Sequence, residues 1–373
     1  MPTYSNLERG DLAPWFVQRS FASPNYVFDT VAGRYVVLCF YGTAADPHGQ
    51  AAIKAMQALS GFFDDKTACC FGVSFDVADE TEKRVADRYP GYRYFWDFNG
   101  TIGRLYGVAP REAKPGDRGV PMRRRWVVLD PALRVIEIIP FADDRSDNDA
   151  VTALLKSLPP LSDFSTAEAP VIVLPQVFEP EFCRKLIERY EAHGGEESGF
   201  MRDVNGRTVL TSDHAHKRRR DYTIDDGELI KETQRRFLRR VAPMIERVHQ
   251  FKATRMERYI VCCYDARDNA HFRAHRDNTT KGTAHRRFAV SVNLNDDFDG
   301  GEVSFPEFGP RSYKPPVGGA VVFSCSLLHA VSTVTRGRRF AFLPFLYDDA
   351  AARIREQNAS FLEGDLAGYR SEL

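Results

Sequence analysis

The 373-residue chain lacks an excess of charge of either sign, because 51 lysines and arginines balance 51 aspartates and glutamates. It also lacks an apolar run near the roughly 18 residues that a membrane-spanning helix requires. Its first residues, MPTYSNLERG, are polar and unlike a secretory signal. Because nucleic-acid-binding chains usually carry a basic excess, we expect a cytoplasmic protein with neither a nucleic-acid nor a membrane partner.

Cysteine is sparse and unpatterned. The seven cysteines are odd in number, and no two of them form a C-x-x-C pair. This usage is typical of reduced thiols rather than of a disulfide framework. The chain also has no internal repeat and no low-complexity tract, and its length predicts two or three domains.

The first half of the chain alternates strand and helix patterns. Continuous apolar runs such as YVVLCFY predict strands buried on both faces, and apolar residues at helical spacing predict the helices between them. The predicted strands are 35–41, 68–75, 126–129 and 135–140, and the predicted helices are 51–63, 80–88 and 147–158. We therefore expect residues 1–158 to form a three-layer α/β domain.

A segment rich in Pro, Ser and Ala at 159–170 is typical of a linker, and the pattern changes after it. Helices are predicted at 179–192 and at 226–251, the second with a kink or break at Pro243. From residue 255 onward short strands alternate with turn residues, which predicts an all-β sandwich, jelly roll or barrel with helices added. The tail, 349–373, is expected to contain a helix.

One H-x-D triplet stands out among the nine histidines, His275-Arg276-Asp277, and His329 closes the later apolar run AVVFSCSLLH. Two imidazoles and one carboxylate form the facial triad of non-haem iron oxygenases, which leaves three metal positions open. A 2-oxo acid fills two of these, and its far carboxylate then needs a cation. Arg339 suits that role, because a guanidinium grips a carboxylate with two hydrogen bonds.

Residues 171–348 resemble the prolyl 4-hydroxylase-like branch of the 2-oxoglutarate- and Fe(II)-dependent dioxygenases. Four ordered segments carry the resemblance: APVIVLPQVFEPEFCRKLIERYEA, RYIVCCYDARDNAHFRAHRDN, FAVSVNLNDDFDGGEVSFPEFG and GGAVVFSCSLLHAVSTVTRGRRFAFLPFLYDD. The resemblance implies a double-stranded β-helix, or jelly roll.

The same resemblance implies a site and its cofactors. His275, Asp277 and His329 would bind Fe(II), and Arg339 would bind the distal carboxylate of 2-oxoglutarate. Tyr264 would line the co-substrate pocket, although it lies eleven residues before His275, slightly further than the family pattern. The other cofactors implied are O2 and, as in relatives, ascorbate. Asp277, rather than Gly or Ala, favours hydroxylation over halogenation.

Residues 1–158 resemble the thioredoxin fold of the peroxiredoxin (AhpC/TSA) family through GDLAPWF, VVLCFYGTAADPHGQAAIKAM and RRRWVVLDPALRVIEI. Aligned on these motifs, Gly49 stands at the peroxidatic cysteine and Asp46 at the neighbouring threonine. We therefore expect this domain to be catalytically inactive and to support a homodimer or position the substrate. Arg124 or Arg125 is either the former peroxide-orienting arginine or a plain strand-end residue.

Several alternatives remain open. The first half could act as a thiol peroxidase through a displaced cysteine such as Cys39, or the chain could be a binding protein on two inactive scaffolds. His271 and His275 could form a zinc pair, whereas His214 and His216 are expected in a surface loop. Three more interpretations concern single features: Tyr264 as a plain core residue, Arg338 as a solvated strand residue, and the basic run 217–220 as a solvated face or a grip for an acidic substrate.

The sequence thus favours an oxygenase that hydroxylates an unactivated C–H bond. The substrate is either an amino-acid-like small molecule or a peptidyl residue, and fold analogy does not choose between them.

Overall fold

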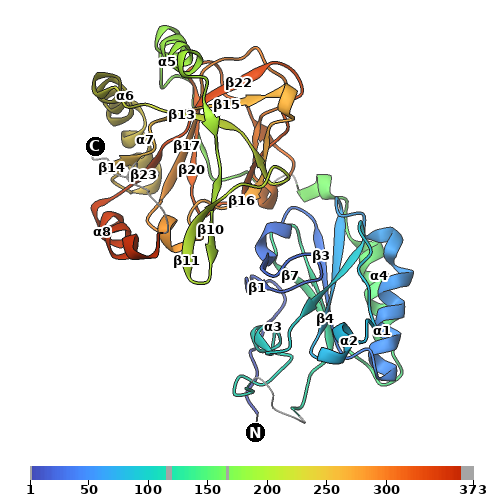
Figure 1. The fold of residues 1–373 in the computed structure, drawn as a ribbon. Helices are drawn as coiled ribbons and strands as arrows, with labels where there is room; N and C mark the ends of the chain where they lie inside the picture. The colour runs from blue at the N-terminus through green and yellow to red at the C-terminus, as the bar shows by residue number, and fades with distance from the viewer. Residues whose placement is uncertain (1, 115–119, 165–167, 363–373) are drawn as a thin grey trace. The chain divides into compact units, whose positions relative to one another are not determined.

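The computed structural model describes residues 2–114, 120–164 and 168–362 (Figure 1). The chain divides into two compact units. The N-terminal unit comprises Met1–Glu168 with Pro306–Pro310, and the C-terminal unit comprises Ala169–Phe305 with Arg311–Leu373. The division lies inside the expected linker 159–170, of which residues 165–167 are outside the described part. Within the described residues, none of the helices has the length and apolar character needed to cross a membrane.

The N-terminal unit is built on one five-stranded sheet, in the order β5-β4-β3-β6-β7. β3, β4 and β5 run parallel to one another. β6 pairs antiparallel with β3, and β7 pairs antiparallel with β6. Every residue of β3 and β4 is buried, as their continuous apolar runs predict. The strands are β3 (Tyr35–Gly42), β4 (Ala68–Ser74), β5 (Tyr92–Trp96), β6 (Arg125–Leu129) and β7 (Val135–Pro140).

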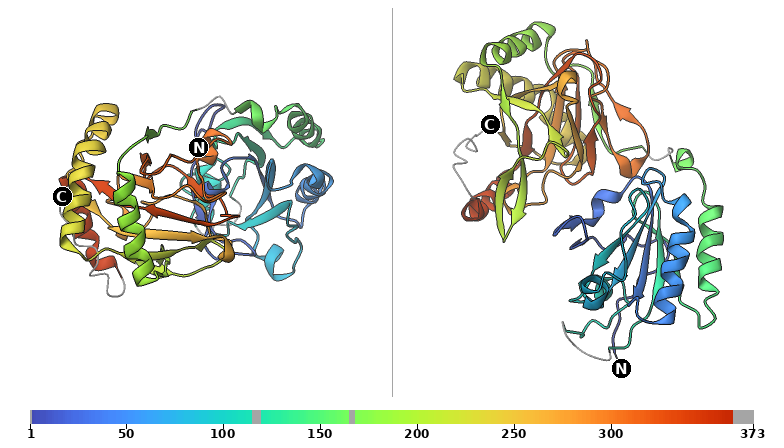
Figure 2. Two further views of the ribbon diagram at one scale, coloured as in Figure 1. Left: turned by 90° about the horizontal axis from the view of Figure 1, so that it is seen from above. Right: turned by 45° about the vertical axis from the view of Figure 1, so that its right-hand side comes forward.

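Two long helices cover one face of this sheet. The other face is covered by aromatic side chains and by the short helix η1 (Phe28–Val31), whose Phe28 packs against Phe71 and Phe95. α1 (Pro47–Ala58) and α4 (Asp147–Ser157) run along the same face (Figures 1 and 2). On the other face, Phe71 stacks on Phe95, and Phe16 on Phe28. The predicted three-layer α/β arrangement is confirmed. All three tryptophans of the chain, Trp15, Trp96 and Trp126, belong to this unit.

The helix predicted at 80–88 is wrong. The structure has only a short helix there, α2 (Val77–Thr81), and Lys83 adopts a left-handed φ of +52° that turns the chain out of it. The backbone N–H of Arg84 donates to the carbonyl of Asp79, and its guanidinium contacts the side chains of Asp76 and Asp79. A residue with a left-handed φ does not continue a right-handed helix, so the helix ends before Lys83.

The C-terminal unit contains two main sheets, which form the expected jelly roll. The larger sheet has the path β14-β23-β17-β22-β15-β13-β9; in addition, β20 pairs with β17, and β8 pairs with β20. The smaller has the order β12-β16-β21-β18-β19. The strands of the larger sheet are β8 (Ile172–Leu174), β9 (Glu196–Glu197), β13 (Arg220–Thr223), β14 (Arg255–Glu257), β15 (Ile260–Asp265), β17 (Phe288–Asn293), β20 (Ala320–Ser324), β22 (Arg338–Phe342) and β23 (Phe345–Tyr347). Those of the smaller are β12 (Lys217–Arg218), β16 (His271–His275), β18 (Val303–Ser304), β19 (Ser312–Tyr313) and β21 (His329–Val331).

Three helices pack against the larger sheet: α5 (Pro180–His193), α6 (Gly227–Arg240) and α7 (Ala242–His249) (Figure 1). Their apolar residues join the same buried cluster as the strands. The long helix predicted at 226–251 is interrupted at Val241, so the expected break is confirmed; Pro243 then lies in the first turn of α7, where proline is tolerated. The expected tail helix is α8 (Asp349–Asn358), and residues 363–373 lie outside the described part.

One short segment joins the two sheets of the C-terminal unit. β12 pairs with β16 in the smaller sheet, and β13 pairs with β15 in the larger one. Arg219 is the single residue between β12 and β13. The chain therefore passes from one sheet to the other at Arg219.

Candidate metal centre

His275 and His329 face each other on paired strands. β16 and β21 are antiparallel, and their register places His275 directly opposite His329. Directly opposed side chains in such a pair lie close together, and these two ring centroids are 4.2 Å apart. Asp277 follows His275 by two positions, in the turn just past the end of β16, where its backbone N–H donates to the carbonyl of Cys325.

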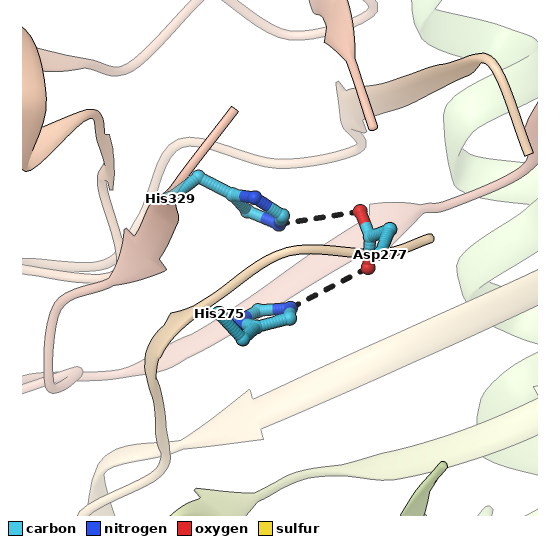
Figure 3. Close-up of side chains that lie close together, drawn as sticks. All are labelled: His275, Asp277 and His329. Carbon is cyan, nitrogen blue, oxygen red and sulfur yellow. Dashed lines mark ion pairs between the residues drawn. The ribbon is translucent and has the colours of Figure 1, made fainter. Parts of the chain in front are cut away.

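The three side chains converge (Figure 3). The carboxylate of Asp277 lies between the two rings, with Oδ1 3.5 Å from Nε2 of His275 and Oδ2 3.4 Å from Nε2 of His329. One ligand atom from each of the three residues lies within 4.8 Å of the others. Two nitrogens and one carboxylate at this spacing could hold a divalent transition metal.

Backbone carbonyls fix the tautomer of both histidines. Nδ1 of His275 lies 2.8 Å from the carbonyl of Arg273, and Nδ1 of His329 lies 3.0 Å from that of Leu327. A carbonyl can only accept, so each Nδ1 carries the proton and each Nε2 presents its lone pair. This is the usual arrangement of a metal-binding imidazole.

The electrostatic environment of His275 and Asp277 favours the protonation states that metal binding requires. Burial, with the nearby charge of His329, lowers the pKa of His275 to about 4. Burial disfavours ionisation of Asp277, but the charges and hydrogen bonds of His329 and His275 outweigh it and hold the pKa of that carboxyl well below its usual range. At neutral pH the group is thus a carboxylate beside a neutral His275 imidazole, the ligand forms that a metal requires.

Arg339 is a buried cation with a free donor. It lies on β22 with 2% of its surface exposed. Nε donates to Oδ1 of Asn293 at 3.1 Å, and Nη2 donates to Oγ of Ser291 at 2.7 Å and to the same Asn293 oxygen at 2.9 Å. Nη1 is buried without a hydrogen-bond partner among the described residues. A buried guanidinium nitrogen of this kind fits an anionic group that the protein itself does not supply.

Tyr264 lies next to Arg339. The two residues are register partners on β15 and β22, and the guanidinium carbon is 5.5 Å from the ring centroid. Tyr264 is buried, and Nη1 of Arg219 donates to its hydroxyl at 3.4 Å. Burial raises the pKa of Tyr264, with Arg219 and Arg339 opposing the shift, so the phenol keeps its proton at neutral pH. The interpretation of Tyr264 as a plain core residue overlooks this polar surrounding.

The other histidines do not join the group. The ring nitrogens of His271 lie near the carbonyls of Asn269 and Ala215, so the zinc-pair interpretation is not supported. His214 is exposed and pairs with Glu197. His216 is partly buried, with its ring 4.5 Å from that of Phe200, so only His214 fits the expected exposed loop.

The structure also corrects the interpretation of the basic run 217–220 as a solvated face. Lys217 and Arg219 are buried, which rules out a fully solvated face. Lys217 donates through Nζ to Oγ of Ser198 at 2.7 Å, and Arg219 pairs with Asp221. Arg220, by contrast, is exposed. Arg338, expected in solvent, is partly exposed and pairs with Glu191 at 2.7 Å.

Sequence reasoning missed Ser291 and Asn293, which hold the Arg339 guanidinium. A signal was present, because the apolar strand FAVSVN carries its only polar residues two positions apart and hence on one face. It also missed Asp221, which alternates with Arg219 in the same way.

In the N-terminal unit, the position at which the sequence alignment expects the peroxidatic cysteine has no room for a side chain. Gly49 lies in the first turn of α1, and a Cβ built there would stand 1.8 Å from the carbonyl oxygen of Thr43. Asp46 caps the helix by accepting from the N–H of Gly49, and Arg124 binds its carboxylate, with Nη1 2.8 Å from Oδ1. The hydrogen bond from Arg124 lowers the pKa of Asp46 despite partial burial. Arg124 is therefore held by Asp46 and not by a peroxide.

The cysteines are not placed for redox catalysis. All seven lie within the described residues, and all are buried. Burial raises the pKa of Cys69 to about 12, and the pKa values of Cys39 and Cys70 rise well above the ordinary range for the same reason. A peroxidatic thiol needs a lowered pKa and access to solvent. These observations disfavour the thiol-peroxidase alternative.

Comparisons with known proteins agree with this division. Residues 258–347 match the 2OG-Fe(II) oxygenase superfamily, and residues 10–137 match the AhpC/TSA family. A PKHD-type hydroxylase of Verminephrobacter eiseniae (strain EF01-2) is 30% identical over 112 residues, which are 28% of this chain and 48% of that protein. The chain thus spans about half the length of this curated relative.

Two solved structures are also similar. One is a prolyl hydroxylase from Trichoplax adhaerens in complex with a hypoxia inducible factor peptide fragment, with 16% identity, a TM-score of 0.41, and coverage of 53% of this chain and 90% of that one. The other is the peroxidoxin BcpB from Mycobacterium tuberculosis, with 22% identity, a TM-score of 0.34, and coverage of 41% of this chain and 99% of that one.

Both resemblances inferred from the sequence are confirmed by the family matches. The chain thus carries one segment similar to the AhpC/TSA family, residues 10–137, and one segment similar to the 2OG-Fe(II) oxygenase superfamily, residues 258–347.

Proposed function

We propose that the chain is an Fe(II)- and 2-oxoglutarate-dependent oxygenase that hydroxylates an unactivated C–H bond, with succinate and CO2 as co-products. The observation that carries the proposal is the convergence of His275, Asp277 and His329, in which both imidazole Nε2 atoms face the Asp277 carboxylate. The donor set fits a ferrous ion, because two imidazoles and a carboxylate occupy one face and leave positions for 2-oxoglutarate and O2. When bound, the iron supplies the oxygen activation.

The chain's own residues bind and orient the co-substrate. Arg339 binds the distal carboxylate of 2-oxoglutarate through Nη1, the nitrogen that has no described partner. Ser291 and Asn293 hold the rest of the guanidinium in place, and the side-chain amide of Asn293 is itself fixed by donating to the carbonyl of Pro315 at 2.8 Å. Tyr264 lines the same pocket.

The substrate proposed is an amino-acid-like small molecule or a peptidyl residue, and ascorbate is proposed to keep the iron reduced. The N-terminal unit is proposed to be non-catalytic and to support a homodimer or to position the substrate. The closed position at Gly49 and the engaged Arg124 support the absence of peroxidase chemistry.

The experiment that tests the proposal measures succinate formed from 2-oxoglutarate by the full chain with ferrous iron, ascorbate and O2. We expect turnover that His275→Ala abolishes and that Arg339→Ala weakens through a higher KM for 2-oxoglutarate. Omitting ascorbate should shorten the period of turnover. If the protein binds neither ferrous iron nor 2-oxoglutarate under anaerobic conditions, the oxygenase proposal is wrong.

A further inference from the structure

Arg219 occupies the crossing between the two sheets of the C-terminal unit and is 7% exposed. Its guanidinium forms a fork with Asp221, with Nε 2.7 Å from Oδ1 and Nη2 2.6 Å from Oδ2. Nη2 also donates to Oγ of Ser198 at 3.2 Å. These contacts fix the orientation of the third nitrogen, Nη1, which donates to the hydroxyl of Tyr264.

The donation from Arg219 determines what the Tyr264 hydroxyl can do. A guanidinium can only donate, so the phenolic oxygen is the acceptor in this contact. The phenolic proton is then available for another acceptor, and none is found among the described residues. Beside it, Nη1 of Arg339 is a second buried donor without an acceptor. Two neighbouring donors that both lack an acceptor fit the two oxygens of one carboxylate.

The charges around Tyr264 point to the same ligand. Arg219 and Arg339 are both buried and both interact with the phenol. Arg219 has a carboxylate partner, Asp221, whereas among the described residues Arg339 contacts only the neutral side chains of Ser291 and Asn293 through hydrogen bonds. Buried charge without a counter-ion is costly, so this pocket is suited to an anion.

We propose that Arg219 is a positioning residue for the co-substrate. It holds Tyr264 so that the hydroxyl donates to the same distal carboxylate that Arg339 binds, and it thereby makes the pocket select dicarboxylic over monocarboxylic 2-oxo acids. This role rests on the proposed oxygenase function and adds a residue to it.

The test measures the dissociation constants of 2-oxoglutarate and of 2-oxovalerate, which has no distal carboxylate. The full chain is loaded with ferrous iron without oxygen and titrated calorimetrically. The variants are Arg219→Lys, Tyr264→Phe and the double variant, with Arg220→Lys as the matched control on the same segment. Arg219→Lys keeps the charge beside Asp221 but cannot contact Asp221 and Tyr264 together.

We expect Arg219→Lys and Tyr264→Phe each to weaken 2-oxoglutarate binding about tenfold, the effect of losing one hydrogen bond to a charged group. The double variant should be no weaker than Tyr264→Phe, because Arg219 acts through the phenol. Binding of 2-oxovalerate should not change in any variant, and Arg220→Lys should match the wild type.

Three results would overturn the role of Arg219: wild-type affinity in Arg219→Lys, additive effects in the double variant, or an equal loss for 2-oxovalerate. If Arg219→Lys fails to fold, the pair Arg219→Gln with Asp221→Asn removes both charges together and should show the same selective loss. Failure of the wild type to bind 2-oxoglutarate would instead overturn the oxygenase proposal, so the two failures are distinguishable.

Discussion

Tyr264 and Arg339 are direct cross-strand partners on β15 and β22. This pairing places the phenol beside the guanidinium whatever the length of the loop that follows. The turn η4 (Ala266–Asp268) and Asn269, at a φ of +50°, take up the residues between β15 and β16. The spacing of eleven residues between Tyr264 and His275 therefore affects the turn between β15 and β16 and leaves the pairing of Tyr264 with Arg339 unchanged.

Arg339→Gln should weaken 2-oxoglutarate binding by roughly 30-fold or more, because a hydrogen bond to a charged group contributes about 2 kcal/mol. Metal affinity should stay unchanged, since Arg339 does not contact the triad. Anaerobic titration of the iron-loaded protein measures both. The neighbouring variant Arg338→Gln, which removes a half-exposed pair with Glu191, serves as control. Equal effects of the two substitutions would contradict the assignment.

Ferrous or manganous ion should stabilise the C-terminal unit. A ligand at 100 times its Kd adds about 2.7 kcal/mol, which corresponds to a rise in Tm of roughly 5–10 °C for a unit of this size. Asp277→Ala should remove the shift, whereas His271→Ala should keep it, because His271 lies outside the triad. Calorimetric unfolding with and without metal, followed by chelation, makes the measurement. A shift that persists in Asp277→Ala would show that the metal binds elsewhere.

Gly49→Ala should destabilise the N-terminal unit by roughly 1–3 kcal/mol, although alanine favours helices by about 1 kcal/mol. The steric clash outweighs the gain in helix propensity, because the obstructing atom is the carbonyl oxygen of Thr43, which belongs to the backbone. Gly61→Ala is the matched control, since a Cβ there would meet nothing within 4 Å. Denaturant unfolding followed by circular dichroism compares them.

For the same reason, Gly49→Cys should gain no peroxide-consuming activity. Its thiol would lack space, and Arg124 is already bound to Asp46. Measurable peroxide turnover by this variant would contradict the closed geometry.

Glu257 should make the stability of the C-terminal unit depend on acid pH. Burial opposes its ionisation, but Arg286 and His285 outweigh burial and hold its pKa at about 2. A folded-state pKa below the unfolded value gives stability that is present above about pH 4.3 and is lost as the pH falls towards 2.

Glu257→Gln should therefore lower the free energy of unfolding by about 3 kcal/mol at pH 7. The difference in this free energy between the variant and the wild type should become smaller below about pH 4. Urea unfolding at a series of pH values tests this expectation. Glu228→Gln, on an exposed pair with Lys231, should show no such trend. A difference that stays constant from pH 7 to acid pH would contradict the role of Glu257.

Much of this molecule was predictable from local patterns. The strands of the N-terminal sheet follow from runs such as YVVLCFY, because continuous burial leaves no polar position. The His-Asp-His set follows from chemistry, since few other uses require those residues in that order. The break in the helix pair α6 and α7 follows from Pro243.

What depends on cross-strand register was not predictable. Nothing in the sequence states that β15 lies beside β22, so the contact of Tyr264 with Arg339 had to come from the fold. The charges of the run 217–220 predict a solvated segment. The structure differs because this segment passes from one sheet to the other, which buries alternate residues. The helix expected at 80–88 failed because the chain turns at Lys83, whose φ is +52°, and a hydropathy pattern does not record such a turn.

The placement of the tryptophans has a practical consequence. Because Trp15, Trp96 and Trp126 all belong to the N-terminal unit, the indole emission of the intact protein reports on that unit alone. Tyrosine emission does not separate the two units, because both contain tyrosine. Changes at the metal centre are instead followed by visible absorption, so one sample offers tryptophan emission for the N-terminal unit and metal absorption for the C-terminal unit.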